Sequence, residues 1–200
     1  MLRIRRILVT VLGGIYFAPA CAPQSKPVLS APPVSDEQLS VYRGFLDRLA
    51  SLDFRNLAKT TIPLDFKGFP EGRPCLVGID LGDPSEALRA SHTFGPEITQ
   101  GRQLKILDSE EQKTLLRQRD SRSVADAQDS FQDSPNRGPE SNILVLSEIA
   151  FDKSHRFAVM KYLLLCGEHC AYGATLVMEK VGSGWTTSQR HLCAMFLSPH

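Results

Sequence analysis

Hydrophobic residues recur at helical spacing over residues 39–52. They occupy Leu39, Tyr42, Phe45, Leu46, Leu49 and Leu52, three or four residues apart. This period places them on one face of an α-helix. Ser35 and Gln38 precede the run as a capping box, in which each side chain binds the backbone N–H of the other residue. We therefore expect an amphipathic helix over 36–51 whose apolar face, including its aromatic residues, packs in the core.

The middle of the chain alternates irregular and weakly periodic segments. Residues 54–82 are rich in proline and glycine and predict a long connection, with a short extended piece at 75–79. Asp83, followed by proline and then by a glutamate three residues on, is typical of a helix start and predicts a short helix over 84–92. Alternation over 103–107 predicts a strand, and the acidic run after it predicts a charged helix over 108–118.

The segment 119–142 contains Val124 and Phe131 as its only sizeable hydrophobic residues. Such a segment buries too little apolar surface to offset the entropy that ordering costs. We expect a mobile insertion here. A loop that folds on contact with a partner is an alternative, although no basic cluster or spaced set of anchors specifies that partner.

The last sixty residues predict closely spaced β-strands separated by turns. The strands are expected over 143–149, 156–165 and 173–181 and from Trp185 onward, with turns at 152–155 and 182–184. Short strands with turns between them indicate an antiparallel meander. The predicted fold is α+β, with N-terminal helices packed on a C-terminal antiparallel β-meander of about four or five strands.

The N-terminal twenty residues have the pattern of a secretory signal peptide. Three arginines precede the apolar run 7–17, which is followed by Ala18, Pro19 and Ala20. An uncleaved membrane anchor is the alternative, but this run is only about half of the roughly 20 apolar residues that a spanning helix needs. We therefore expect 1–20 to be removed on export and residues 36–198 to form a single domain.

Cys21 follows the predicted cleavage site, as in a bacterial lipobox that receives a diacylglycerol. The segment 21–35 is rich in proline and serine and suits an extended tether. Lipidation of Cys21 also leaves an even number of cysteines for an oxidising compartment. The sequence thus favours attachment to a membrane through a lipid on Cys21, with a freely secreted protein as the alternative.

The other four cysteines are disulfide candidates with three possible connectivities. These are Cys75, Cys166, Cys170 and Cys193. We favour a short 166–170 bridge together with a 75–193 bridge, which would close a long loop. Sequence alone does not choose among the connectivities.

Two chemical alternatives use the same cysteines. Cys166, Cys170 and Cys193 with His169 and His191 could supply the four ligands of a zinc ion, although their spacing matches no standard zinc motif. Cys166 or Cys170 could instead act as a nucleophile with His155, His169 or His191 as its base. In an exported protein disulfides are the default, so we predict no metal and no cofactor.

Composition excludes several function classes. The 200 residues carry 23 basic and 22 acidic side chains, a net charge of +1, which lacks the basic footprint of a nucleic-acid-binding protein. The phosphate-binding loop, the dinucleotide-binding glycine motif, the nucleophile elbow and the zinc-protease motif are all absent. No nucleic-acid partner and none of these common catalytic sites is expected.

The C-terminal region resembles a family of uncharacterised exported bacterial proteins. The residues that match are Leu146-Ser147-Glu148-Ile149-Ala150-Phe151, Ala158, Cys166-Gly167, Cys170, Gly173 to Glu179-Lys180, Gly184, Trp185 and Leu197-Ser198. The similarity covers 142–198, and Phe196 replaces the tryptophan that this family usually has near its end. The resemblance implies export and the strand meander, and it implies no activity.

The leading hypothesis is therefore an exported, lipid-anchored envelope protein with a binding or structural role. The alternative is a small exported enzyme, either a hydrolase or a thiol-dependent enzyme, with a cleft between its helices and its sheet.

Overall fold

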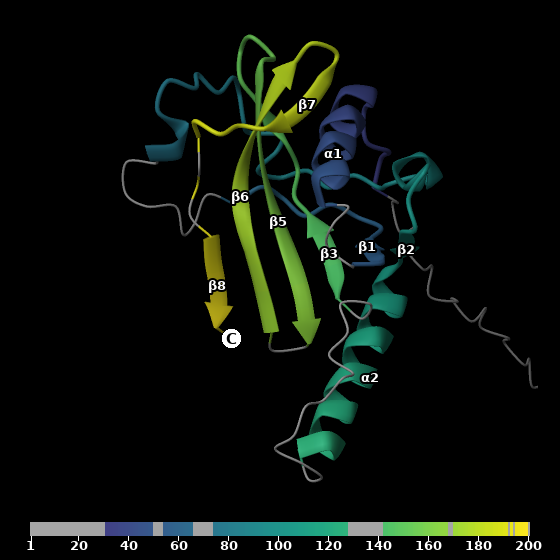
Figure 1. The fold of residues 1–200 in the computed structure, drawn as a ribbon. Coiled ribbons are helices and arrows are strands. Elements are labelled where there is room, and N and C mark those ends of the chain that lie inside the picture. Colours follow the sequence, from purple (N-terminus) through teal and green to yellow (C-terminus); the bar gives the residue numbers. More distant parts are fainter. Residues whose placement is uncertain are drawn as a thin grey trace, which may run out of the picture.

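The computed structural model describes residues 31–49, 54–65, 74–127, 142–167, 170–191, 193 and 195–199, and it has an α+β fold (Figure 1). The described helices are α1 (Asp36–Arg48) and α2 (Ser109–Ala127), with short 3₁₀ turns η2 (Pro74–Leu76) and η3 (Pro96–Thr99). The described strands are β1 (Asn56–Ala58), β2 (Lys105–Leu107), β3 (Ile143–Leu146), β4 (Ala150–Phe151), β5 (Phe157–Gly167), β6 (Cys170–Val181), β7 (Gly184–Thr187) and β8 (Met195–Pro199).

These strands form one mixed sheet, not the antiparallel meander of four or five strands that we predicted. Its order is β2-β1-β3-β5-β6-β7, with β4 paired to β5 and β8 paired to β6. The C-terminal strands are antiparallel as expected, but β1 runs parallel to both β2 and β3. Three-residue strands such as β1 and β2 are too short to show alternation, so the pattern of the sequence did not identify this edge of the sheet.

The long hairpin of β5 and β6 is the centre of the sheet. Its register runs from Phe157 opposite Glu179 to Leu165 opposite Ala171. The turn before β5 and the turn after β6 lie where the sequence places them, and each uses a residue with positive φ, His155 and Gly182 respectively. A single face of this hairpin carries the main core, while its other face packs on smaller apolar clusters.

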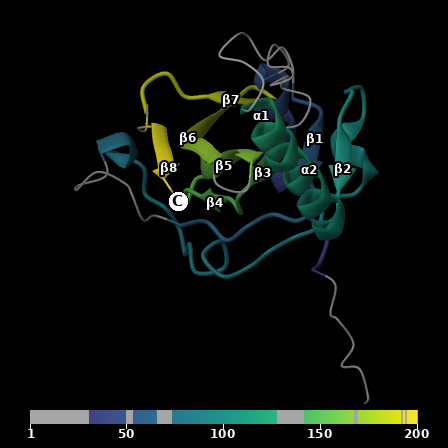
Figure 2. The same ribbon diagram turned by 90° about the horizontal axis from the view of Figure 1, so that it is seen from below.

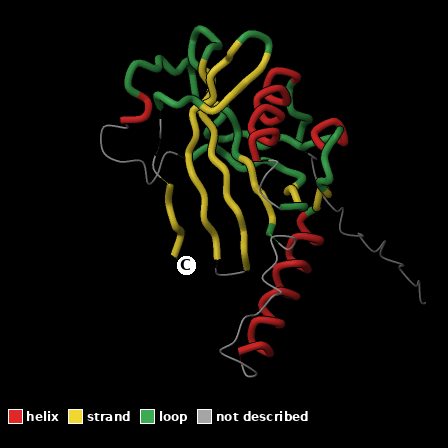
Figure 3. Tube along the Cα trace, in the orientation of Figure 1, coloured by secondary structure: helices red, strands yellow, loops and turns green. Residues whose placement is uncertain are grey.

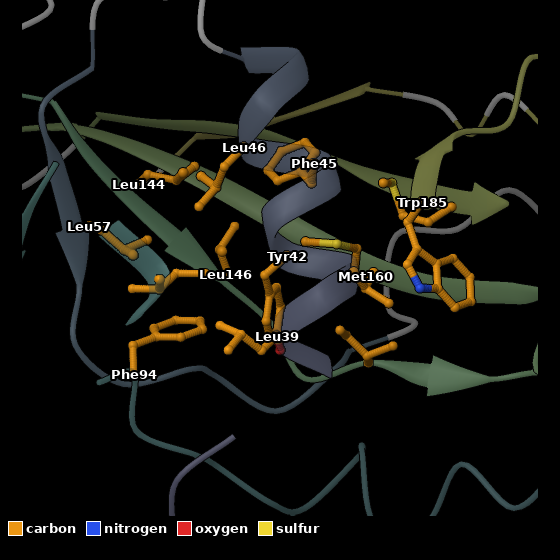
Figure 4. Close-up of a cluster of buried hydrophobic side chains, with 14 of the residues drawn as sticks. Leu39, Tyr42, Phe45, Leu46, Leu57, Phe94, Leu144, Leu146, Met160 and Trp185 are labelled. Atoms are coloured by element: carbon orange, nitrogen blue, oxygen red, sulfur yellow. The ribbon is translucent and has the colours of Figure 1, made fainter. Parts of the chain in front are cut away.

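Helix α1 begins as predicted with the capping box of Ser35 and Gln38, and it ends at Arg48. Its buried face packs against the sheet through Tyr42, Phe45 and Leu46, which lie among Leu144, Leu146 and Met160 in Figure 4. The helix also lies very close to β7, because a Cβ at Gly44 would collide with the backbone of Trp185. The predicted amphipathic helix is therefore confirmed as the main cover of the sheet.

Three predicted elements differ in the structure. The chain forms turns over 84–89 where we expected a helix, and η2 with a turn where we expected an extended piece at 75–79. Helix α2 continues to Ala127, into the predicted mobile insertion 119–142, and the residues 128–141 lie outside the described part of the chain. Extending an existing helix requires no new nucleus, so few hydrophobic residues suffice for these added turns.

Between β1 and β2 the described residues, 59–65 and 74–104, are mostly loop (Figure 3). This loop runs past β4 on one side of the sheet (Figure 2) and is joined to it by a bridge between Leu81 and Asp152. Residues 31–35, the end of the predicted tether, also pair with the loop, since Val34 N–H donates to the carbonyl of Thr93. The loop and the start of the domain thus meet beside β4.

Residues 1–30, which hold the predicted signal peptide and Cys21, lie outside the described residues. Among the helices of the described residues, none has both the length and the apolar character needed to cross a membrane.

Candidate functional site

A buried carboxylate lies in the short segment between β3 and β4. Glu148 is only 1% exposed. Leu146 and Ala150 are four positions apart in the sequence, yet their partners on β5, Tyr162 and Val159, are only three positions apart. This extra residue interrupts the ladder in the manner of a β-bulge. The backbone N–H of Glu148 is thereby released from β5 and donates to the carbonyl of Ile62.

The carboxylate of Glu148 accepts hydrogen bonds from three other segments. Oε1 is bound by the hydroxyl of Thr61 and by the backbone N–H of His92 at 3.0 Å. Oε2 lies 2.9 Å from Nδ1 of His92 and accepts from the amide of Gln38 at 3.2 Å. A buried charge is tolerable only when it is bonded in this way. Glu148 therefore joins α1, the loop after β1 and the loop before β2.

These partners are placed by local structure. Gln38 completes the capping box with its amide oxygen, which leaves its amide nitrogen free to reach Glu148. The backbone N–H of Thr61 donates to the carbonyl of His92, and the hydroxyl of Thr61 accepts from the N–H of His92. Thr61 and His92 are thus locked to each other as well as to the carboxylate.

The hydrogen-bond pattern determines the tautomer of His92. An ionised carboxylate can only accept, so Nδ1 must carry the proton in the contact with Glu148. In the neutral ring, Nε2 is then an acceptor with a free lone pair. No hydrogen bond joins Nε2 to any residue in the described part of the chain, and the His92 side chain is 13% exposed. The arrangement is a histidine oriented by a buried carboxylate.

His92 and Glu148 line a cleft of about 460 Å³, which we call the His92 cleft. The start of α1 contributes Ser35 and Gln38 to its lining, and the long loop contributes residues from its 82–87 segment. The segment around β4 contributes apolar residues, Ile149, Ala150 and Phe151, and polar ones, Asp152, Lys153 and His155. Clefts of this size in proteins accommodate small molecules.

Several polar groups that line the cleft already have partners. Lys153 forms an ion pair with Asp80 at 2.9 Å, and His155 lies 3.0 Å from Glu37 while its ring stacks on Phe151. The backbone N–H of Ser85 donates to Asp83 and lowers the pKa of that carboxyl. Glu86 is exposed, and no described residue forms an ion pair or hydrogen bond with its carboxylate.

Tyr42 packs beneath the same segment. Burial, and after it the negative charge of Glu148, raises the pKa of Tyr42 well above its ordinary value. The phenol therefore remains protonated, and it donates to the carbonyl of Ser147 at 2.7 Å. This bond holds the backbone next to Glu148 against α1.

Asp152, which also lines the cleft, fixes the turn of residues 152–157. Burial alone raises the pKa of Asp152, but hydrogen bonds from the Ser154 hydroxyl and from three backbone N–H groups outweigh it, so the pKa lies below its ordinary value. Those N–H groups belong to Phe157, Ser154 and Arg156. The ionised carboxylate is thus part of the folded turn.

The lowered pKa gives a testable pH dependence. A carboxyl whose pKa is lower when folded stabilises the fold above its unfolded pKa of about 3.9, and this contribution is lost as the pH falls through the folded pKa. We expect Asp152→Asn to lower the free energy of unfolding by about 1–3 kcal/mol at neutral pH. Its unfolding midpoint in urea should also fall less steeply than that of the wild type below about pH 4. Glu110→Gln, a change at an exposed helix carboxylate, is the control, and an identical slope in wild type and Asp152→Asn would contradict this assignment.

Two of the four disulfide candidates are bonded to each other, and neither is a lining residue of the His92 cleft. Cys75 and Cys193 form a disulfide between residues 118 apart in the sequence, and Nδ1 of His191 lies 3.1 Å from the carbonyl oxygen of Cys75. Cys166 is also disulfide-bonded. The side chain of Cys170 and all of Cys21 lie outside what the structure describes, so the 166–170 bridge and the lipid site stay predictions.

The disulfide bonds affect the two alternatives that used the cysteines, a zinc site and a cysteine nucleophile. Because Cys193 is bonded to Cys75 and Cys166 is oxidised, neither is available as a thiolate ligand or as a nucleophile. Within the described residues no group of three or more metal-binding side chains comes together, and His169 lies outside them. His155 lines the His92 cleft, whereas His191 lies beside the Cys75–Cys193 disulfide.

Neither a family model, nor a curated protein, nor a solved structure matches the chain. The site must therefore be interpreted from its own geometry. Sequence reasoning missed His92 and used Glu148 only as part of the family resemblance. The available signal was a single charged residue inside the mostly apolar run 143–151, because a charge in a buried segment requires partners. Nothing local marked His92, which lies 56 residues before its partner.

Proposed function

We propose that the protein is an exported, lipid-anchored component of the bacterial envelope whose domain binds a small ligand in the His92 cleft. The observation that carries the binding role is the oriented histidine: a buried carboxylate holds its Nδ1 while Nε2 has no partner among the described residues. The disulfide between Cys75 and Cys193 is compatible with an oxidising compartment. The signal peptide and the lipid on Cys21 rest on the sequence pattern.

The point at which the tether enters the domain supports a role close to a membrane. Pro33 and Ser35 line the His92 cleft, so the chain leads directly from the predicted anchor to the proposed binding site. Ala31 lies ten positions after Cys21, and a chain of that length at full extension reaches about 35 Å. A lipid on Cys21 would therefore keep the cleft near the membrane surface.

A binding role is preferred to hydrolysis for a structural reason. A hydrolase that uses a histidine base and a side-chain nucleophile needs a hydroxyl or thiol within hydrogen-bond reach of Nε2. No such group contacts Nε2 of His92 in the described part of the chain, and the hydroxyl of Thr61 is bonded to Glu148 instead. The pair of His92 and Glu148 is therefore better suited to hold a ligand than to attack one.

Export and anchoring can be tested by intact mass. We expect full-length protein expressed in a Gram-negative host to be recovered from the membrane fraction, cleaved before Cys21 and carrying acyl chains. Cys21→Ser should be recovered without acyl chains, and it serves as the matched control. Uncleaved protein in the cytoplasm would contradict the proposal.

A further inference from the structure

The hydrogen-bonding state of His92 and the charges around it point to one class of ligand. We propose that the His92 cleft binds a small molecule through an ammonium group, with Nε2 of His92 as its acceptor and Glu86 as its counter-ion. This inference rests on the proposed binding function, and it adds the chemical class of the ligand.

The acceptor in the cleft is Nε2 of His92. Four donor groups surround the carboxylate of Glu148, which therefore acts only as an acceptor. The proton between Glu148 and His92 lies on Nδ1, and the neutral ring offers a lone pair at Nε2. A carboxylate behind a histidine also fixes the orientation of the ring. The cleft thus presents a fixed acceptor that requires a donor from its ligand.

Most charged residues that line the cleft are acidic. The side chains of Asp83, Glu86, Glu148 and Asp152 line the cleft, and Lys153 is the one lysine or arginine among the described lining residues. Lys153 is already paired with Asp80. An anionic ligand would find no uncommitted cation there, whereas a cationic ligand enters a favourable field.

Glu86 is the carboxylate best placed to pair with the ligand. The turn of residues 152–157 occupies both oxygens of Asp152, and Glu148 is saturated by its four donors. Asp83 accepts from Ser85 with one of its oxygens. Glu86 lines the cleft, is exposed, and has no ion pair within the described chain.

The apolar lining limits the rest of the ligand. Ala87, Ile149 and Phe151 line the cleft between the polar groups, so a short hydrocarbon chain would bury its surface there. Both a soluble alkylamine and the ethanolamine headgroup of a membrane lipid carry an ammonium on a short chain. The tether brings a membrane within reach, so the test must distinguish these two sources.

The single tryptophan provides a reporter for binding. Trp185 lies 6.0 Å, ring centre to ring centre, from Phe151, which lines the cleft. We would titrate the full chain in detergent with n-butylamine and follow Trp185 fluorescence, with n-butanol and butyrate as neutral and anionic probes of the same length. The proposal predicts saturable binding of butylamine that is at least about tenfold tighter than that of either control.

Variants assign the binding to the cleft. Glu86→Gln, at an exposed position that should not affect folding, is expected to weaken butylamine binding about twofold to fivefold. Glu110→Gln on α2 is the matched control and should leave the affinity unchanged. His92→Ala should weaken binding about tenfold or more, provided that the circular dichroism of the variant matches that of the wild type.

The source of the ammonium is tested with vesicles. Binding to phosphatidylethanolamine vesicles that exceeds binding to phosphatidylcholine vesicles, with a dependence on Glu86, supports the same ligand class with a headgroup as its source. Equal or tighter binding of butanol or butyrate at His92 would overturn the ammonium assignment while the binding function stands. If neither these three probes nor the vesicles bind, both the inference and the proposed function fail.

Discussion

Replacing Glu148 with alanine should lower the free energy of unfolding by about 3–5 kcal/mol. The change removes the acceptor that Gln38, Thr61 and His92 share, and it leaves their donors unpaired in a largely buried site. Each unpaired buried donor costs about 1–3 kcal/mol, and part of that cost is recovered by local rearrangement. Urea unfolding at neutral pH measures the effect.

Two further variants define the origin of this loss. Glu148→Gln retains one acceptor oxygen and the shape of the side chain, so it should be less destabilising than Glu148→Ala. Glu110→Ala removes an exposed carboxylate and should change stability by less than about 0.5 kcal/mol. A loss below about 1 kcal/mol for Glu148→Ala would mean that the network does not hold these segments together.

Removing the Cys75–Cys193 disulfide should cost about 4–5 kcal/mol, because the bond closes a loop of more than one hundred residues in the unfolded chain. The double variant Cys75→Ser with Cys193→Ser avoids a free thiol. For a domain of this size the loss corresponds to a fall of roughly 10–20 °C in the unfolding temperature. Calorimetry under oxidising conditions measures this change.

Cys166→Ser with Cys170→Ser is the matched comparison. If these two residues are paired as we predicted, their bond closes a loop of only a few residues, and its removal should cost about 2 kcal/mol in the same chain-entropy model. An equal loss for the two double variants, or a loss below about 1 kcal/mol for the 75–193 pair, would contradict the assignment by loop length.

The parts of the fold that local patterns encode could be predicted from the sequence. The capping box and the apolar positions from Leu39 to Leu46 predicted α1, and the runs around the 152–155 and 182–184 turns predicted the β5–β6–β7 strands. These elements depend on contacts between residues that are close in sequence. Their side-chain periods therefore carry the information.

The parts that distant contacts determine could not be predicted. Strand β1 has three residues, and its place between β2 and β3 depends on parallel pairing with segments more than forty residues away. The His92 cleft depends on a bulge that turns Glu148 toward Gln38, Thr61 and His92, each from a different segment. No sequence motif of fixed spacing predicts contacts among segments that lie so far apart in the chain.

The measurement that tests this account most directly is the protonation state of the His92 ring nitrogens, by ¹⁵N NMR of the side chain at about pH 8, where imidazoles are ordinarily neutral. We expect a proton on Nδ1, held by Glu148, and an unprotonated Nε2. This signature should disappear in Glu148→Ala, while the signals of His155 and His191 keep their wild-type pattern. A proton on Nε2, or exchange between the two tautomers, would contradict the claim that the buried carboxylate prepares His92 as the acceptor of the cleft.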